Sequence, residues 1–303
     1  MGDYVLGIGL STVDLVGKVM GFPEPDKYSF MSEFDLQIGG PVSNALVALS
    51  RMGIQTKWVG KVGDDDFGKL ILQGMEKESV DIKNIVIDKK NTSPLSFIIV
   101  TDTGERSIIF HPGCAFVLEE EVPKGIIQNA SIIHLDGAFI DAALPAAKLG
   151  KELGVKISLD AGIAFPGLND LLKIIDIFIP NYDVAKELTK EESIDVCLKK
   201  LWEMGPPLVV ITNGAEGSWG YDGKQIIKQD AIKVSVVDTT GCGDAFHGGF
   251  LYGELQGWNL KSKLLFATAY ASLKATRLGG RKGLPTKKDM VQFIKERNLD
   301  LPL

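Results

Sequence analysis

The chain has 303 residues, of which 45% are apolar and 24% are charged, and its formal net charge is −6. This composition is ordinary for a globular protein, and the length is ample for an α/β fold with a large core. The negative balance argues against non-specific binding to nucleic acid. No apolar run is long enough to span a membrane, and the first residues lack the pattern of a signal peptide. We therefore expect neither a nucleic-acid partner nor a membrane partner.

The cysteines, Cys114, Cys197 and Cys242, are odd in number and form no Cys-x-x-Cys pair. Such usage implies no disulfide framework and is typical of proteins in a reducing compartment. The three histidines are too scattered along the chain for a sequence-local metal site. We expect a cytoplasmic protein.

The apolar run at residues 4–10 predicts a buried first strand, and Asp14 follows it closely. Open α/β sheets place ligand contacts at the carboxyl ends of their strands, so Asp14 is a candidate binding residue. A solvated loop acid is the alternative. Gly7 and Gly9 look like the start of a dinucleotide fingerprint, but Thr12 stands at the third glycine position, which leaves a weak match.

The stretch at residues 16–38 contains two prolines and has no helical pattern. Two β-rich runs, 94–100 and 106–110, surround a turn at residues 101–105 and predict a hairpin. We expect these segments to form a small sheet that projects from the core.

A helix is predicted over residues 45–52 by the spacing of its apolar residues, and Gly39 and Gly40 precede it. Adjacent glycines allow a ligand to approach the backbone closely. Asn44 lies near the helix start. It is either a helix cap or an amide that both donates to and accepts from a substrate hydroxyl.

Elsewhere in the chain, strand and helix patterns alternate, which predicts parallel strands joined by right-handed crossovers. The predicted strands are apolar almost throughout, as a sheet covered on both faces requires. The predicted strands cover residues 56–62, 132–135, 156–160, 176–179 and 208–212, and the predicted helices cover residues 70–77, 142–153, 168–174, 185–188, 194–204 and 264–278.

The β-branched residues at 234–237 predict a strand, which breaks at a loop containing Gly241 and Gly243 before a predicted helix. Glycines at such a junction let backbone N–H groups converge on an anion, and the helix N-terminus adds partial positive charge. Asp244 lies in the first turn of this helix. An anion cradle beside an ionised base suggests phosphoryl transfer to a hydroxyl. A glycine-rich turn with Asp244 as a helix-start residue is the alternative.

Four segments, in this order and spacing, resemble the pfkB (ribokinase-like) carbohydrate kinase family over essentially the whole chain. They are residues 39–45 (GGPVSNA), 63–68 (GDDDFG), 212–217 (TNGAEG) and 238–250 (DTTGCGDAFHGGF). A phosphate-binding-loop NTPase is disfavoured, because no Gly-x-x-x-x-Gly-Lys-Ser/Thr segment occurs.

The resemblance implies an α/β fold, a ribokinase-like three-layer α/β/α sandwich with a mainly parallel central sheet and a small β-sheet lid. It implies one kinase domain over residues 1–303, with lid segments near 16–38 and 92–112. The edge strands of such a lid offer a surface for a homodimer.

The resemblance also implies the chemistry, which is transfer of the ATP γ-phosphate to a hydroxyl of a small sugar, usually a primary one. Asp244 would be the catalytic base. Gly241, Cys242 and Gly243, with the amide of Asp244, would form the anion hole for the transferring group. Mg²⁺ would accompany ATP, and a monovalent cation is a further candidate cofactor.

Two binding sets follow from the same resemblance. Asp14 and Asn44, with the backbone of Gly39 and Gly40, would hold sugar hydroxyls. ATP would lie against a second set of residues, which are Asn181, Thr212, Gly214, Gly217 and Gly243.

One departure from the family pattern concerns the metal. The family usually has Asn-x-x-Glu after the strand that ends near residue 180, and the glutamate acts on Mg²⁺ through water. Here Asn181 is in place, but Val184 stands at the glutamate position. Asp183 and Glu187 are substitute candidates with different spacing, which leaves the metal ligands unassigned. A catalytically inactive sugar-binding homologue is therefore kept as an alternative. Within the family, a nucleoside kinase is the closest enzymatic alternative.

A second departure is Cys242, which replaces the commoner alanine between the two glycines. An exposed thiol at a helix N-terminus would have a lowered pKa and would be sensitive to oxidation. A small buried side chain is the alternative.

Overall fold

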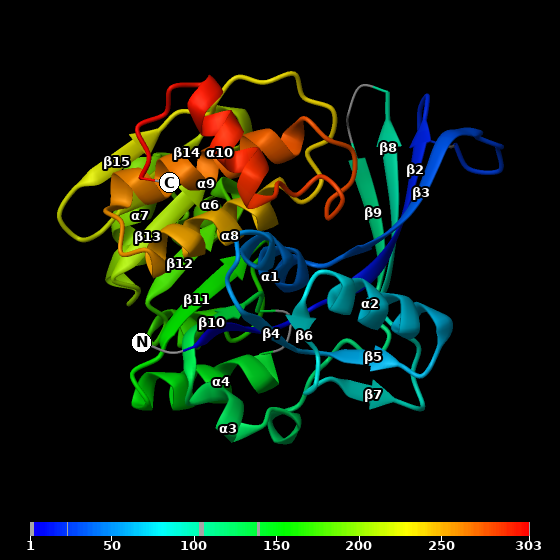
Figure 1. The fold of residues 1–303 in the computed structure, drawn as a ribbon, viewed down its shortest axis with the longest axis horizontal. Helices are drawn as coiled ribbons and strands as arrows, with labels where there is room; N and C mark the ends of the chain where they lie inside the picture. Colours follow the sequence, from blue (N-terminus) through cyan, green and yellow to red (C-terminus); the bar gives the residue numbers. More distant parts are fainter. Residues whose placement is uncertain (1–2, 23, 103–105, 138–139, 303) are drawn as a thin grey trace.

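The computed structural model describes residues 3–22, 24–102, 106–137 and 140–302. These residues form a central nine-stranded sheet with helices on both faces, and a separate four-stranded sheet stands away from it (Figure 1). The predicted three-layer architecture with a second small sheet is therefore confirmed.

The central sheet has the order β15-β14-β13-β12-β11-β10-β1-β4-β6. All neighbours from β6 to β13 are parallel, and β14 and β15 form an antiparallel hairpin at one edge. The inner strands are apolar along most of their length because helices cover both faces. The strands are β1 (Tyr4–Ile8), β4 (Thr56–Val59), β6 (Val80–Asp81), β10 (Ala130–Leu135), β11 (Lys156–Ala161), β12 (Ile177–Pro180), β13 (Leu208–Thr212), β14 (Ser218–Tyr221) and β15 (Ile226–Gln229).

Each face of this sheet has its own hydrophobic core, and each core is closed by a different set of helices. The first set is η1 (Glu119–Glu121), α3 (Lys124–Ile127), α4 (Ile140–Glu152), α5 (Leu168–Leu172), α6 (Tyr182–Thr189) and α7 (Ile194–Glu203). The second set is α1 (Pro41–Arg51), α2 (Asp66–Lys77), α8 (Cys242–Leu255), α9 (Leu260–Ala275) and α10 (Lys287–Glu296). The longest of the described helices, α9, has 16 residues, and none of them reaches across a bilayer.

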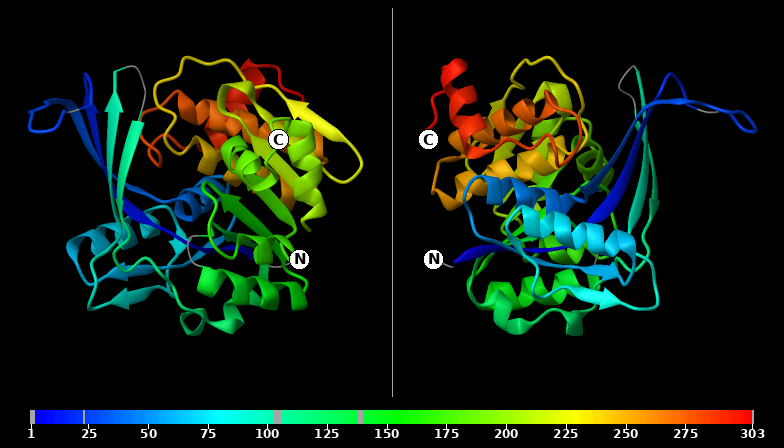
Figure 2. Two further views of the ribbon diagram at one scale, coloured as in Figure 1. Left: turned by 180° about the vertical axis from the view of Figure 1, so that it is seen from behind. Right: turned by 45° about the vertical axis from the view of Figure 1, so that its right-hand side comes forward.

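The second sheet has the order β3 (Met31–Gly39), β2 (Thr12–Val19), β8 (Leu95–Thr101), β9 (Arg106–His111). β2 pairs with β8 in parallel, and the other two pairs are antiparallel. Both views of Figure 2 show this sheet projecting from the body of the molecule. Residues 103–105 of the predicted hairpin turn lie outside the described residues.

The pairing of strands in the second sheet produces one polar face and one apolar face. Gln37, Asp14 and Ser96 are cross-strand neighbours in one row, and all three are buried. The opposite face carries an apolar row, in which Leu36, Phe97 and Ile109 are exposed and Leu15 is half-buried. Since side chains alternate along a strand, the polar row and the apolar row point away from each other.

Three helices pack unusually closely near the carboxyl edge of the central sheet. A Cβ atom at Gly248 of α8 would lie 2.5 Å from the Cβ of Ala48 in α1. A Cβ atom at Gly249 would lie 3.0 Å from the Cα of Ala267 in α9. The two glycines therefore let α8 approach both neighbouring helices at backbone distance.

Two of the predicted strands differ in the structure. Residues 234–237 form no strand, because the amides of Val237 and Asp238 both donate to one carbonyl, that of Ala275 at the end of α9. The stretch at 56–62 divides after β4, and its second part becomes β5 (Lys61–Gly63), which pairs with β7 (Val86–Asp88) in a sheet of its own. In both places tertiary contacts override β propensity.

Candidate active site

The sequence-predicted helix start is formed by the first turn of α8. Gly241 precedes the helix with φ of 74°, a left-handed conformation that favours glycine. Asp244 follows in the first turn, and its Oδ2 accepts a hydrogen bond of 2.7 Å from Nδ2 of Asn44. The structure thus joins two candidate residues that are 200 positions apart in the chain.

The amides around Gly241 only partly fit the expected anion cradle. The Cys242 amide already donates to the carbonyl of Thr239 at 3.1 Å, so it closes the turn. The amides of Gly243 and Asp244 belong to the first helical turn, which has no intrahelical acceptors for its N–H groups. Gly243 is exposed and has open space where a Cβ would stand, so an anion can reach this turn.

Cys242 does not carry the reactive thiol that an exposed position would have given. Its Sγ donates to the carbonyl of Ala271 at 3.7 Å, and burial raises its pKa. Of the two alternatives for Cys242, the structure therefore supports the small, packed side chain.

On the side of Asp244 that faces the second sheet, a group of buried side chains has polar atoms without a hydrogen-bond partner in the described structure. These atoms are Oδ1 of Asp14, both amide atoms of Gln37 and Nη1 of Arg281. Buried polar atoms are nearly always paired, so ordered water or a polar ligand would complete this group. Gly39 makes the arrangement sterically feasible, since a Cβ there would lie 1.9 Å from Oδ2 of Asp14.

Arg281 connects this group to Asn44. Its Nε donates to Oδ1 of Asn44 at 3.2 Å, and its Nη2 donates to Oγ of Ser43 at 2.8 Å. Because the amide oxygen of Asn44 faces the guanidinium, its nitrogen is directed to Asp244. Burial lowers the pKa of Arg281 to about 10, which leaves it charged at neutral pH.

The environment of Asp244 is suited to a base. Burial raises its pKa to about 6, and the charge of Asp160 adds to the increase. The hydrogen bond from Asn44 and the electrostatic influence of His247 and Arg106 act in the opposite direction. A carboxyl group with a pKa near 6 is mostly ionised at neutral pH and still accepts a proton readily.

Asp14 has a less ionised carboxyl group. Burial raises its pKa to about 7, the hydrogen bond from Ser96 lowers it in part, and the charge of Asp244 raises it. At neutral pH, Asp14 therefore exists in both protonation states, so it can donate to or accept from a ligand hydroxyl.

Beneath Asp244, a buried polar layer links α8 to the central sheet. Nε2 of His247 lies 3.2 Å from Oδ1 of Asp160, which stands near the end of β11. The ring of His134 in β10 lies 5.4 Å from the His247 ring, and burial lowers the His134 pKa to about 3. These contacts position Asp244 above the carboxyl ends of β10 and β11.

The remaining candidates lie beyond β11, at the ends of β12 and β13. Asn181 and Thr212 form an isolated parallel bridge there. Both groups of the Asn181 amide are used, since Oδ1 caps α6 at 2.9 Å and Nδ2 donates to the carbonyl of Gly162. Gly214 and Gly217 follow β13 with φ of 49° and 101°, and a Cβ at Gly217 would lie 2.1 Å from the carbonyl oxygen of Gln229.

The metal candidates do not converge. The Asp183 side chain is 91% exposed and lies 3.5 Å from Lys186, and Glu187 is exposed. Val184 is buried, so an apolar side chain stands where the family has its glutamate. No group of three or more metal-binding side chains occurs among the described residues. The residues of α6 therefore do not fit a protein-built Mg²⁺ site.

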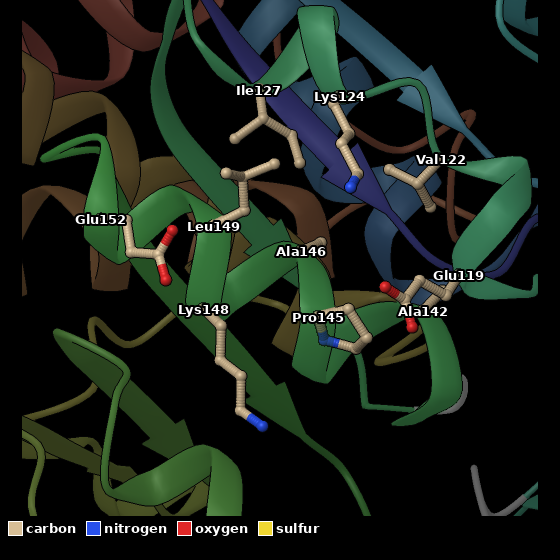
Figure 3. Close-up of a pocket in the computed structure, with 10 residues that line it drawn as sticks. All are labelled: Glu119, Val122, Lys124, Ile127, Ala142, Pro145, Ala146, Lys148, Leu149 and Glu152. Atoms are coloured by element: carbon tan, nitrogen blue, oxygen red, sulfur yellow. The ribbon is translucent and has the colours of Figure 1, made fainter.

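Gln37, Arg281 and Arg106 are site residues that the sequence interpretation missed or set aside. Nothing in a strand sequence marks Gln37, whereas Arg281 has the weak signal of following a glycine pair. Arg106, at the start of β9, has no sequence signal of its own, and its charge acts weakly on Asp244. A further cavity of about 320 Å³, between α4 and residues 119–127, contains none of the candidate residues (Figure 3).

Comparisons with known proteins show the family of this chain. Residues 3–287 match the family described as pfkB family carbohydrate kinase. An Archaeoglobus fulgidus protein named as an uncharacterized sugar kinase is 31% identical over 252 residues, which cover 80% of this chain and 100% of that protein. A Methanothermobacter thermautotrophicus nucleoside kinase is 28% identical, with coverage of 95% and 94%. Arabidopsis thaliana ribokinase, solved with ribose and ATP, has a TM-score of 0.87 at 25% identity, with coverage of 97% and 99%.

Proposed function

Because the chain belongs to the pfkB family of carbohydrate kinases, we propose that it transfers the γ-phosphoryl group of ATP to a hydroxyl of a small sugar. The observation that carries the proposal is the Asn44–Asp244 pair, which lies beside three buried side chains with unpaired polar atoms. A polyhydroxylated ligand would supply the missing donors and acceptors. Asp244 as the base and the start of α8 as the anion-binding group complete the requirements of a kinase.

We call Asp14, Gln37, Asn44 and Arg281, with the backbone of Gly39 and Gly40, the sugar side. We call Asn181, Thr212, Gly214 and Gly217, which are proposed to border ATP, the nucleotide side. Strand order supports this division, because the sugar side lies near β1 and the second sheet, whereas the nucleotide side lies at β12 and β13. Asp244 stands between them, above β10 and β11.

In the proposed reaction, Asp244 takes the proton of the acceptor hydroxyl, preferably a primary one. The freed oxygen attacks the γ-phosphorus, the bond to the β,γ-bridging oxygen breaks, and ADP leaves. The helix start formed by Gly241, Cys242, Gly243 and the amide of Asp244 would hold the transferring group. Mg²⁺ bound to ATP would neutralise charge on the β- and γ-phosphates. Because α6 offers no fitting carboxylate, no step of the reaction is assigned to a metal held by this chain.

The larger organisation is proposed on the same grounds. Residues 1–303 would form one kinase domain, with segments 16–38 and 92–112 as a lid that excludes water from the phosphates. The exposed apolar row of the second sheet supports a homodimer through this lid. The cytoplasmic location stays a prediction from the cysteine usage.

A nucleoside kinase is the second candidate, and the similarity to the Methanothermobacter enzyme favours keeping it. An inactive sugar-binding homologue is the third, because Val184 replaces a residue linked to Mg²⁺ in the family. The presence of Asp244 with its partner Asn44 argues against the inactive homologue.

The deciding experiment is a coupled ADP-release assay over pentoses, hexoses, keto-sugars and nucleosides. We expect ADP release with at least one sugar, and no release above background with Asp244→Asn protein prepared in parallel. Release with nucleosides alone would assign the second function. Sugar binding by calorimetry without ADP release from any acceptor would overturn the kinase proposal.

A further inference from the structure

A lysine that the proposed reaction does not use is entirely buried beside the anion-binding loop. Lys274, in the last turn of α9, has no exposed surface. Lysine is almost never fully buried unless its ammonium group is paired. Its Nζ donates to the backbone carbonyl of Asp238 at 2.9 Å and lies 3.8 Å from the carboxylate of the same residue.

Asp238 is the residue through which this lysine acts on the loop. Its Oδ1 accepts from the amide of Thr240 at 2.8 Å, and its Oδ2 accepts from the amide of Gly279 at 2.8 Å. Thr240 is followed directly by Gly241 and the first turn of α8. The loop before the anion cradle is therefore held to α9 and to the 276–280 segment through one carboxylate and one ammonium group.

The printed oxygen contacts of the ammonium group come from Asp238, and the end of the side chain is closely packed. A Cβ atom at Gly283 would lie 3.0 Å from Cε of Lys274, 2.8 Å from the carbonyl oxygen of Gly279 and 3.2 Å from that of Arg277. The end of the lysine side chain thus shares a tightly packed space with backbone carbonyls and with the Asp238 carboxylate. Carbonyl and carboxylate oxygens are the ligands that hard cations prefer.

We propose that Lys274 is a built-in cation that fixes the anion-binding loop, so that the kinase needs no monovalent cation at this place. The proposal rests on the proposed function, because the loop matters through the phosphoryl group that it holds. Lys274 is a positioning residue, since its ammonium group touches the loop and not the reacting atoms. A free monovalent cation does not fit beside Asp238, because the lysine already occupies that place.

The first test compares wild-type turnover in potassium chloride, sodium chloride and choline chloride at equal ionic strength. We expect less than a twofold difference. The second test uses Lys274→Ala, which removes the charge and leaves room for an ion. We expect turnover in choline chloride to fall about 100-fold, as for loss of an anion-hole donor, with a largely unchanged sugar KM. Ammonium or potassium ions should raise the turnover of Lys274→Ala at least tenfold above its value in choline chloride.

Lys274→Met and the thermal unfolding midpoint give two further tests of this role. Lys274→Met removes the charge but fills the space, so we expect it to be inactive without rescue. The thermal unfolding midpoint of Lys274→Ala, measured without substrates, should rise in potassium relative to choline, whereas the wild-type midpoint should not. Lys263→Ala is the matched control, because Lys263 is buried in the same helix but pairs with Glu254; it should gain nothing from potassium.

Strong potassium activation of the wild type would overturn the proposal, and so would full activity of Lys274→Ala in choline. The unfolding measurements need no acceptor sugar. They therefore test whether Lys274 takes the place of a cation even if the protein is not a kinase. Failure of this proposal can thus be distinguished from failure of the proposed function.

Discussion

The sugar side and the nucleotide side of the candidate site are built differently. On the sugar side, buried side chains from Asp14, Gln37 and Arg281 keep polar atoms without a partner. On the nucleotide side, the amide of Asn181 is already fully used, and the backbone path of Gly214 and Gly217 shapes the surface. In the proposed kinase, acceptor choice would therefore depend on individual side chains, whereas nucleotide binding would depend mainly on the course of the backbone.

The largest expected effect lies between the two sides, at Asp244. Asp244→Asn should reduce kcat by roughly 10³-fold, within the usual range for loss of a general base, with the ATP KM changed less than threefold. In the wild type, kcat/KM should rise with pH through about 6 and level off above it, because the carboxylate must be ionised. Steady-state kinetics from pH 5 to 9 checks both. A variant that turns over at the wild-type rate would remove Asp244 from its assigned role.

The next effect should separate the two sides. Arg281→Gln removes a buried charge and its hydrogen bonds to Asn44 and Ser43. We expect the sugar kcat/KM to fall about 100-fold, as for other buried charged partners, while ATP affinity is retained. Lys282→Gln is the matched control, because Lys282 is exposed and pairs with Asp35 at the surface; its kinetics should change less than twofold. Equal losses of sugar and ATP affinity in Arg281→Gln would break the division into two sides.

Asp14→Asn should show a smaller loss of function together with a gain in stability. The Asp14 pKa is about 7 in the folded protein and about 3.9 in the unfolded chain, so the folded state binds more protons between these values. Stability therefore falls as pH rises through this window. At pH 8 the neutral variant should be stabilised by roughly 1–3 kcal/mol, while sugar affinity drops about tenfold. Denaturant unfolding and calorimetry check this, and a variant with unchanged sugar affinity would make Asp14 a structural residue.

The smallest effect is expected at the metal candidates of α6. The Asp183 side chain is almost fully exposed, and its nearest partner is Lys186. Asp183→Asn and Glu187→Gln should therefore change the Mg²⁺ concentration for half-maximal rate less than twofold, since exposed charges contribute little. A shift of more than fivefold in either variant would show that α6 does supply a ligand through water.

Local sequence patterns predicted the parts of the site that depend on local structure. The helix start at Gly241 and the position of Asp244 follow from a glycine-rich break before an apolar run. Gln37 and Arg281 could not be predicted, because their importance comes from burial between elements that meet only in the fold. The strand predicted at residues 234–237 does not form, because of another contact that exists only in the fold. The β propensity of these residues is high, but the amides of Val237 and Asp238 donate to the carbonyl of Ala275 at the end of α9.

The close packing of α8 against α1 and α9 determines how tolerant the site is to mutation. Asn44 belongs to α1 and Asp244 to α8, so their 2.7 Å hydrogen bond depends on the distance between the axes of these two helices. One methyl group added at Gly248, where Ala48 leaves no room, would force these axes apart and lengthen that bond. During laboratory evolution, the proposed acceptor side should therefore tolerate changes more freely than Gly248 and Gly249, which set the spacing of Asn44 and Asp244.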